Sequence, residues 1–99
     1  MKPETRLFLI CYDVADDKRR RKIYKCLRGF GQHLQFSVFR CPLSPIQLET
    51  LRDVLEELVS AREDQVLLIP LGRASNPKVW ETLTIGRPVV PYVRAAQVF

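Results

Sequence analysis

The residue best placed for chemistry is Asp13, which lies between an apolar run, residues 6–12, and a basic run, residues 18–22. A strand end holds a carboxylate in a fixed direction. Mg²⁺ takes oxygen ligands, and one or two carboxylates plus phosphate oxygens make a site. One Asp per chain supplies few protein ligands for a metal. A two-fold interface that joins two copies of Asp13 would complete the site beside a phosphate to be cut. Alternatively, Asp13 only hydrogen-bonds the backbone at the strand end, and the spacing leaves both readings open.

Basic residues are concentrated around and after Asp13. Residues 1–42 hold ten Lys and Arg against four Asp and Glu, whereas residues 43–99 hold six against seven. Such charge is typical of a phosphate-binding surface, although a solvated helix face is the alternative. Arg19 or Arg20 could extend its charged head toward Asp13 or a substrate. The candidate nucleic-acid-binding residues are Lys18, Arg19, Arg20, Arg21, Lys22 and Lys25.

Other catalytic and metal chemistry lacks its usual residues. His33 is the only histidine, which argues against a zinc site or a serine–histidine pair. Cys11, Cys26 and Cys41 are odd in number and widely spaced, so we expect reduced, buried side chains. Ser37 lacks an obvious relay partner and is expected to hydrogen-bond or kink a strand. No membrane span or secretory signal is recognisable, which predicts a cytoplasmic protein.

A strand must hold Asp13, and a helix must carry the basic run. Residues 6–12 are almost continuously apolar, as in a central strand buried on both faces. A helix is predicted from residues 16–17, whose carboxylates favour its positive end. Gly29 and Gly31 bracket its end, where a left-handed residue commonly stops a helix. Its apolar stripe comprises Ile23, Cys26, Leu27 and Phe30.

The following segment, residues 33–41, has the two-residue period of a strand. Whether it forms one bent strand or two is open, because no Gly or Asn marks a tight turn. Phe36 and Phe39 would point to opposite faces of a regular strand. One of them would then be exposed, where it could stack on a base or pack against a dimer partner. Core packing is expected for Phe36.

A second helix is predicted from Ser44, a capping serine followed by Pro45 and by Gln47 three residues after the cap. Its apolar stripe comprises Leu48, Leu51, Leu55 and Leu58, widened by Val54 and Val59. Residues 65–71 form another apolar strand, in which Pro70 belongs near a strand end or on a sheet edge.

These elements predict one domain, residues 1–99, of the α+β class: a ferredoxin-like βαββαβ sandwich with both helices on one face of the sheet. Residues 1–72 form the core. Residues 73–99 form an extension with a helical turn around Trp80 and a strand-like end, residues 92–99. Because the other sheet face is left for a second subunit, we expect a homodimer in which the extension is a dimerisation or partner-binding arm.

Three motifs then resemble one known family: Tyr12-Asp13-Val14, residues 16–22, and Gln35-Phe36-Ser37-Val38-Phe39. At this spacing the combination is similar to the Cas-two family, the small CRISPR-associated nuclease of spacer acquisition. The similarity runs from the first strand through the second helix, and the segment beyond Gly72 carries little of it.

The resemblance implies a homodimeric, Mg²⁺-dependent endonuclease that cuts single-stranded RNA or double-stranded DNA, with Asp13 as metal ligand and catalytic residue. Tyr12, Arg20 and Phe39 match the family's other catalytic-site residues, and Phe39 would shape the groove. The family also bridges dimers of the adaptation integrase. A non-catalytic DNA-binding scaffold is therefore the alternative function.

The sequence departs from the family's usual pattern at two positions. His33 stands where Arg is common, and Arg40 stands where an acidic residue is usual. Both changes alter charge near the expected substrate groove, so they bear on substrate preference and not on the fold.

Overall fold

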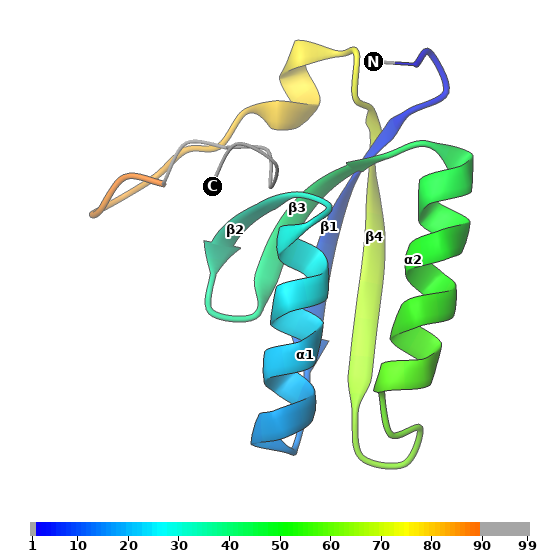
Figure 1. The fold of residues 1–99 in the computed structure, drawn as a ribbon. Coiled ribbons are helices and arrows are strands. Elements are labelled where there is room, and N and C mark those ends of the chain that lie inside the picture. The colour runs from blue at the N-terminus through cyan, green and yellow to red at the C-terminus, as the bar shows by residue number, and fades with distance from the viewer. Residues whose placement is uncertain (1, 90–99) are drawn as a thin grey trace.

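The computed structural model describes residues 2–89, in which two helices lie on one face of a four-stranded antiparallel sheet (Figure 1). The sheet order is β2-β3-β1-β4, which is the ferredoxin-like arrangement that the sequence predicts. The elements are β1 (Arg6–Asp13), α1 (Asp17–Arg28), β2 (Gln32–Gln35), β3 (Val38–Leu43), α2 (Pro45–Leu58), β4 (Gln65–Arg73) and the 3₁₀ helix η1 (Pro77–Trp80).

Strand β1 lies at the centre of the sheet, between β3 and β4. Its last residue, Asp13, pairs with Gln65, the first residue of β4. The β1–β4 register shifts between Leu7 and Phe8, which face Gly72 and Pro70 respectively. Pro70 therefore lies beside an irregularity in an edge strand, where a missing N–H is tolerated, as predicted.

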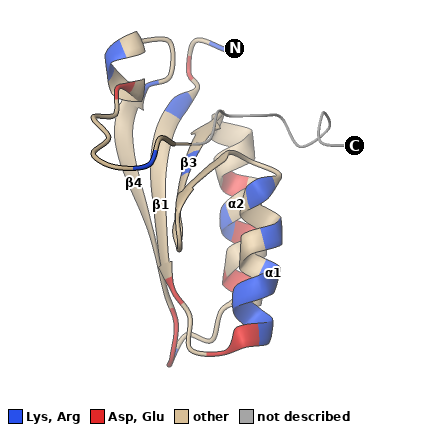
Figure 2. Ribbon diagram, turned by 90° about the vertical axis from the view of Figure 1, so that its left-hand side faces the viewer, with Lys and Arg blue, Asp and Glu red and all other residues tan. Residues whose placement is uncertain are grey.

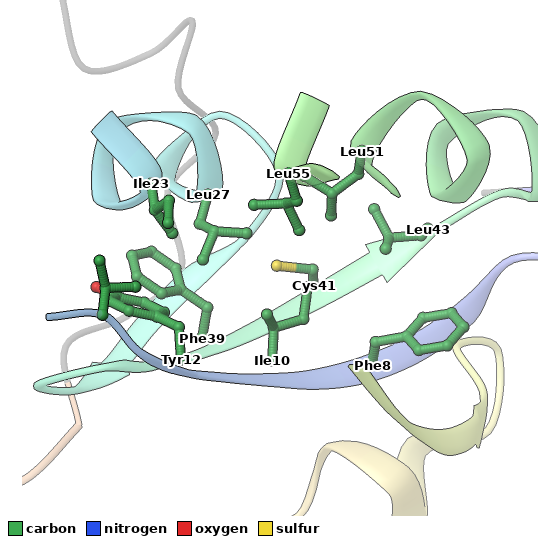
Figure 3. Close-up of a cluster of buried hydrophobic side chains, with 11 residues drawn as sticks. Phe8, Ile10, Tyr12, Ile23, Leu27, Phe39, Cys41, Leu43, Leu51 and Leu55 are labelled. Atoms are coloured by element: carbon green, nitrogen blue, oxygen red, sulfur yellow. The ribbon is translucent and has the colours of Figure 1, made fainter. Parts of the chain in front are cut away.

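The main core fills the space between the helices and the sheet (Figure 3). Alternate side chains of β1 and β3 point toward the helices, and the buried helical residues meet them there. The thiol of Cys41 lies in this core, and burial raises its pKa to about 12. All three cysteines are free, but only Cys41 is fully buried and the other two are half-buried. The core cluster comprises Phe8, Ile10, Tyr12, Val14, Ile23, Leu27, Phe39, Cys41, Leu43, Leu51 and Leu55.

Both helices begin at the predicted caps. The Asp16 side chain accepts a hydrogen bond from the Arg19 backbone N–H at 2.9 Å. Ser44 and Gln47 form a reciprocal capping box, which satisfies backbone N–H groups that have no partner inside a helix. The stripe of α2 is narrower than predicted, because Val54 is exposed.

The end of α1 corrects one prediction. Gly29 has φ −75°, so no left-handed residue stops this helix. Gly31 is required for a different reason: a Cβ there would lie 2.3 Å from the Arg40 carbonyl oxygen and 2.6 Å from the Cys41 sulfur. Close approach of the chain to β3 therefore selects glycine at this position.

The segment left open in the sequence forms two strands, β2 and β3, joined by a turn at residues 36–37. Phe36 lies at this turn with 88% of its surface exposed, so the prediction that it packs in the core is wrong. Phe39 is fully buried instead. The turn breaks the alternation on which the prediction depended, since both residues no longer belong to one regular strand.

Residues 74–82 cross one end of the sheet face opposite the helices. The predicted helical turn around Trp80 is confirmed as η1, and the Trp80 indole N–H donates to the Ala74 carbonyl at 2.8 Å. Arg40 of β3 donates to the Trp80 carbonyl at 2.9 Å and to Thr82 Oγ1 at 2.7 Å. The expected strand at residues 92–99 lies outside the described residues. Within residues 2–89, no helix is long and apolar enough to cross a membrane.

Candidate metal and nucleic-acid site

Asp13 is exposed at the end of β1. Because side chains alternate along a strand and Tyr12 points into the helix-side core, Asp13 lies on the opposite sheet face with Leu9 and Cys11. Within residues 2–89 its carboxylate makes no hydrogen bond or ion pair. The geometry therefore gives Asp13 no backbone-capping role and leaves both its oxygens accessible.

Arg20 is fixed beside the residue that follows Asp13. Its Nε and Nη2 donate to the Val14 carbonyl at 3.3 and 3.1 Å, and its Nη1 donates to the Asp17 carboxylate at 2.6 Å. The side chain remains 39% exposed. Of the candidate arginines, Arg20 is thus held at the backbone of the residue that follows Asp13, with its charge partly open to solvent.

Arg19 forms an ion pair with another residue of the same chain. Its Nε and Nη2 donate to the Asp64 carboxylate at 2.8 and 3.1 Å, and Asp64 has no exposed side-chain surface. The hydrogen bond from Arg19 and those from the Ser60 and Ala15 backbone N–H groups hold the pKa of Asp64 well below its usual range. Arg19 is therefore the predicted nucleic-acid-binding residue with the least freedom to reach a phosphate.

The other predicted cationic residues lie along α1, whose Lys and Arg positions are blue in Figure 2. Lys18, Arg21, Lys22 and Lys25 are all exposed. Arg28 is also exposed, and its guanidinium lies 5.8 Å from the centre of the Tyr24 ring. We refer to these five residues as the α1 basic face. Their charges are open to solvent, as binding to a phosphate backbone requires.

Tyr12 and Phe39 lie in the core on the helix side of the sheet (Figure 3), whereas the Asp13 side chain lies on the opposite face. Their ring centres are 6.3 Å apart. Tyr12 is only 6% exposed, burial raises the pKa of its hydroxyl, and the hydroxyl donates to the Phe36 carbonyl at 3.5 Å. Because Phe39 is fully buried, the expectation that its side chain shapes a groove is wrong for the isolated chain. Both rings instead support the strands and the β2–β3 turn.

His33 belongs to the same aromatic group. Its Nε2 lies 3.0 Å from the Phe36 carbonyl oxygen, to which it donates, and its ring centre is 4.8 Å from that of Phe39 and 5.1 Å from that of Tyr24. The histidine therefore fixes the β2–β3 turn.

Sequence reasoning misses Asp64. The residue is separated from Arg19 by 45 positions, and its burial becomes apparent only when the loop before β4 packs against the start of α1. The only local signal is an acidic residue immediately before an apolar strand, which equally describes a solvated loop.

The described residues of one chain offer a metal ion few protein ligands. Within residues 2–89, no group of three or more His, Cys, Asp or Glu side chains could hold an ion. Asp13 offers one unengaged carboxylate, which suits a hard cation such as Mg²⁺ but leaves the protein ligand set incomplete. A second copy of the chain is the simplest source of another carboxylate.

The sheet face that carries Asp13 is also apolar. On β4, Leu67, Ile69 and Leu71 are 46%, 41% and 40% exposed. Beyond η1, Leu83 and Ile85 are each 93% exposed. Apolar side chains gathered on a face without helices are typical of a surface that another protein covers.

Comparison with known proteins agrees with this fold. The family model described as CRISPR associated protein Cas2 matches residues 6–79. A relative from Geobacter sulfurreducens, named CRISPR-associated endoribonuclease Cas2, is 37% identical over 90 residues, covering 91% of this chain and 94% of the relative. A Synechocystis relative of the same name is 49% identical over 71 residues, covering 70% and 75% of the two chains.

Solved structures give the same result. The crystal structure of Streptococcus pyogenes Cas2 superposes with a TM-score of 0.66 at 29% identity, covering 79% of this chain and 99% of that one. A hypothetical protein from Thermus thermophilus superposes with a TM-score of 0.70 at 32% identity, covering 87% and 99%. With the family match extending from β1 to η1, this chain belongs to the Cas2 family of CRISPR-associated proteins.

Proposed function

We propose that the chain is an Mg²⁺-dependent endonuclease of CRISPR spacer acquisition that cuts single-stranded RNA or double-stranded DNA in the cytoplasm. The observation that carries the proposal is the accessible Asp13 carboxylate, which is held at a strand end and engaged by no group in residues 2–89. The relatives' name, endoribonuclease, supports the same reaction class.

The active form we propose is a homodimer formed through the sheet face opposite the helices. Exposed Leu67, Ile69 and Leu71 favour burial of this face, and Asp13 lies on it. An isologous interface places equivalent residues of two chains around one axis, so two copies of Asp13 would approach each other near it. Residues 73–99 are proposed to extend this interface and to contact the adaptation integrase.

In this dimer the two Asp13 carboxylates would hold the metal, and the substrate phosphate would complete its oxygen ligands. Mg²⁺ bound there would supply an activated water and stabilise the charge that develops on the phosphate. Arg20, fixed on the Val14 carbonyl, would stabilise a phosphate oxygen beside Asp13. The α1 basic face would hold the nucleic-acid backbone. Tyr12 and Phe39 would act from the core by fixing the strands that carry the site.

The test is cleavage of labelled single-stranded RNA and of duplex DNA by the parent chain and by Asp13→Asn, each with Mg²⁺ or EDTA. We expect EDTA and Asp13→Asn each to remove cleavage, because either change removes the metal or its ligand. Asp53→Asn is the matched control, since Asp53 is an exposed acidic residue on α2. Cleavage by Asp13→Asn at the parent's rate would overturn the proposal.

A second function, a non-catalytic scaffold that binds DNA and bridges the integrase, is favoured by the exposure of the α1 basic face on a different element from Asp13. It predicts duplex binding that weakens steeply with salt and survives Asp13→Asn. No cleavage by the parent, combined with such binding, would make the scaffold the better account.

A further inference from the structure

Asp64 joins three parts of the chain that surround Asp13. Its Oδ1 accepts from the Ala15 backbone N–H at 3.0 Å and from Arg19 Nη2 at 3.1 Å. Its Oδ2 accepts from Arg19 Nε at 2.8 Å and from the Ser60 backbone N–H at 2.9 Å. Four donors thus satisfy one carboxylate that has no exposed side-chain surface. A buried carboxylate with this many partners defines a single local geometry.

The position of Asp64 relates this geometry to Asp13. Ala15 lies two residues after Asp13, where the chain has left the sheet. Asp64 immediately precedes Gln65, the residue that pairs with Asp13 at the end of the β1–β4 ladder. Asp64 therefore holds the chain on both sides of the last pair in the sheet, where strand ends otherwise fray.

Arg19 extends the same contact into α1. Its backbone N–H binds the Asp16 cap while its side chain binds Asp64, so the first turn of α1 is fixed to the loop before β4. Arg20, the next residue, donates to the Val14 carbonyl from this fixed turn. The direction of Asp13 and the position of Arg20 both depend on the segment that Asp64 holds.

We infer that Asp64 is a positioning residue for Asp13: it touches no substrate, and it sets the path of the backbone that aims the carboxylate. This inference depends on the proposed nuclease function for its catalytic consequence. Residues that orient a metal ligand from outside the site change metal affinity or activity by about 10- to 100-fold when mutated.

The experiment compares the parent with Asp64→Asn, an isosteric change that replaces one acceptor oxygen with an NH₂ group facing existing donors. We expect kcat for cleavage to fall roughly tenfold with KM for the nucleic acid nearly unchanged, because the α1 basic face is untouched. Asp53→Asn is again the control and should retain both constants.

A second readout does not depend on cleavage. Amide hydrogen exchange measured without metal should become faster at Ala15 in Asp64→Asn and stay unchanged in Asp53→Asn, because only the former replaces one of the two oxygens that the Ala15 N–H shares with three other donors. Circular dichroism establishes that each variant is folded. If Asp64→Asn does not fold, Arg19→Lys serves instead, since it keeps a cation beside Asp64 but loses the two-pronged hydrogen bond.

The outcomes separate this inference from the proposed function. If the parent cuts and folded Asp64→Asn, or Arg19→Lys in its place, cuts with the parent's kcat, the inference is overturned and the nuclease proposal stands. If the parent does not cut, the nuclease proposal fails, and exchange decides the positioning role: faster exchange at Ala15 supports it, and unchanged exchange overturns it.

Discussion

The two faces of the sheet differ in how completely a single chain covers them. The helix-side face is closed: Ile10, Phe39 and Cys41 of the sheet and Leu27 and Leu51 of the helices have no exposed surface. Among residues 2–89, the opposite face is covered only at one end, where Arg40 donates to the Trp80 carbonyl of η1 and to Thr82 (Figure 2). At its other end it exposes Asp13. The covered face accounts for the stability of the chain, and the exposed face carries the candidate chemistry.

The largest effect is expected from a change inside the closed face. Leu51→Ala should destabilise the protein by about 2–5 kcal/mol, because it leaves a cavity in a core that cannot fully collapse. Ile46→Ala on the same helix is the matched control, since Ile46 is 70% exposed, and it should cost about 0.5 kcal/mol or less. Urea denaturation measures both. Equal losses for the two variants would mean that the core on the helix side of the sheet does not account for the stability of the chain.

A charge on the open face should act on assembly and not on folding. Ile69, on β4, is 41% exposed, so Ile69→Lys is expected to leave the monomer folded and to weaken the proposed dimer at least about tenfold, because a lysine would be desolvated in the interface. Sedimentation equilibrium measures the dissociation constant. Thr50→Lys, on the exposed side of α2, should not change it. An unchanged constant for Ile69→Lys would place the interface elsewhere.

A smaller effect is expected at η1, which covers one end of the sheet face opposite the helices. Arg40→Met keeps an apolar stem but removes the hydrogen bonds to the Trp80 carbonyl, to Thr82 Oγ1 and to Gln32 Oε1 of β2, together with the guanidinium that lies 5.4 Å from the Trp80 ring centre. We expect a loss of about 1–3 kcal/mol, confined to the segment around η1 and its contact with β2. Hydrogen exchange at the Trp80 indole should accelerate, whereas Arg62→Met, at an exposed loop position, should leave it unchanged. Global unfolding of Arg40→Met under native conditions would contradict a local role.

The smallest effect is expected in the pH dependence of stability, through Asp64 in the loop before β4. The folded-state pKa of Asp64 lies below its ordinary value of 3.8, so its stabilising contribution is present above that value and is lost as pH falls below it. Asp64→Asn should therefore lose less stability than the parent when the pH is lowered from about 6 to about 3. Denaturation at both pH values measures the difference. Equal losses would mean that Asp64 does not contribute to the acid sensitivity.

Prediction from sequence succeeded where the signal is local. The cap at Asp16, the capping box at Ser44 and the core positions Ile23 and Leu27 are all confirmed, because each depends on neighbours within a turn or two of the helix. It was wrong at Phe36, where a turn between β2 and β3 without glycine interrupts the alternation. Phe36, which was expected in the core, is exposed, and Phe39 is buried in its place.

In the candidate site, too, local signals predicted some features and only the structure showed others. Asp13 was predicted as the metal ligand from its place between an apolar and a basic run, and the structure places it exposed at the end of β1. By charge and position alone, Arg19 and Arg20 were both candidates to reach a phosphate, and only the family resemblance favoured Arg20. The structure distinguishes them because Asp64 engages Arg19, whereas Arg20 bonds the Val14 carbonyl beside Asp13.

The sequence by itself determined the ferredoxin-like fold and singled out Asp13 as the candidate metal ligand, because apolar periodicity, caps and a carboxylate at a strand end are all encoded within short windows. Only the tertiary structure decided which face each strand residue occupies, which arginine remains available, and that Asp64 holds the segment after Asp13. These features depend on contacts between residues tens of positions apart, as with Arg19 and Asp64 at a separation of 45. No local pattern specifies such contacts, since they arise when separate elements pack on one sheet.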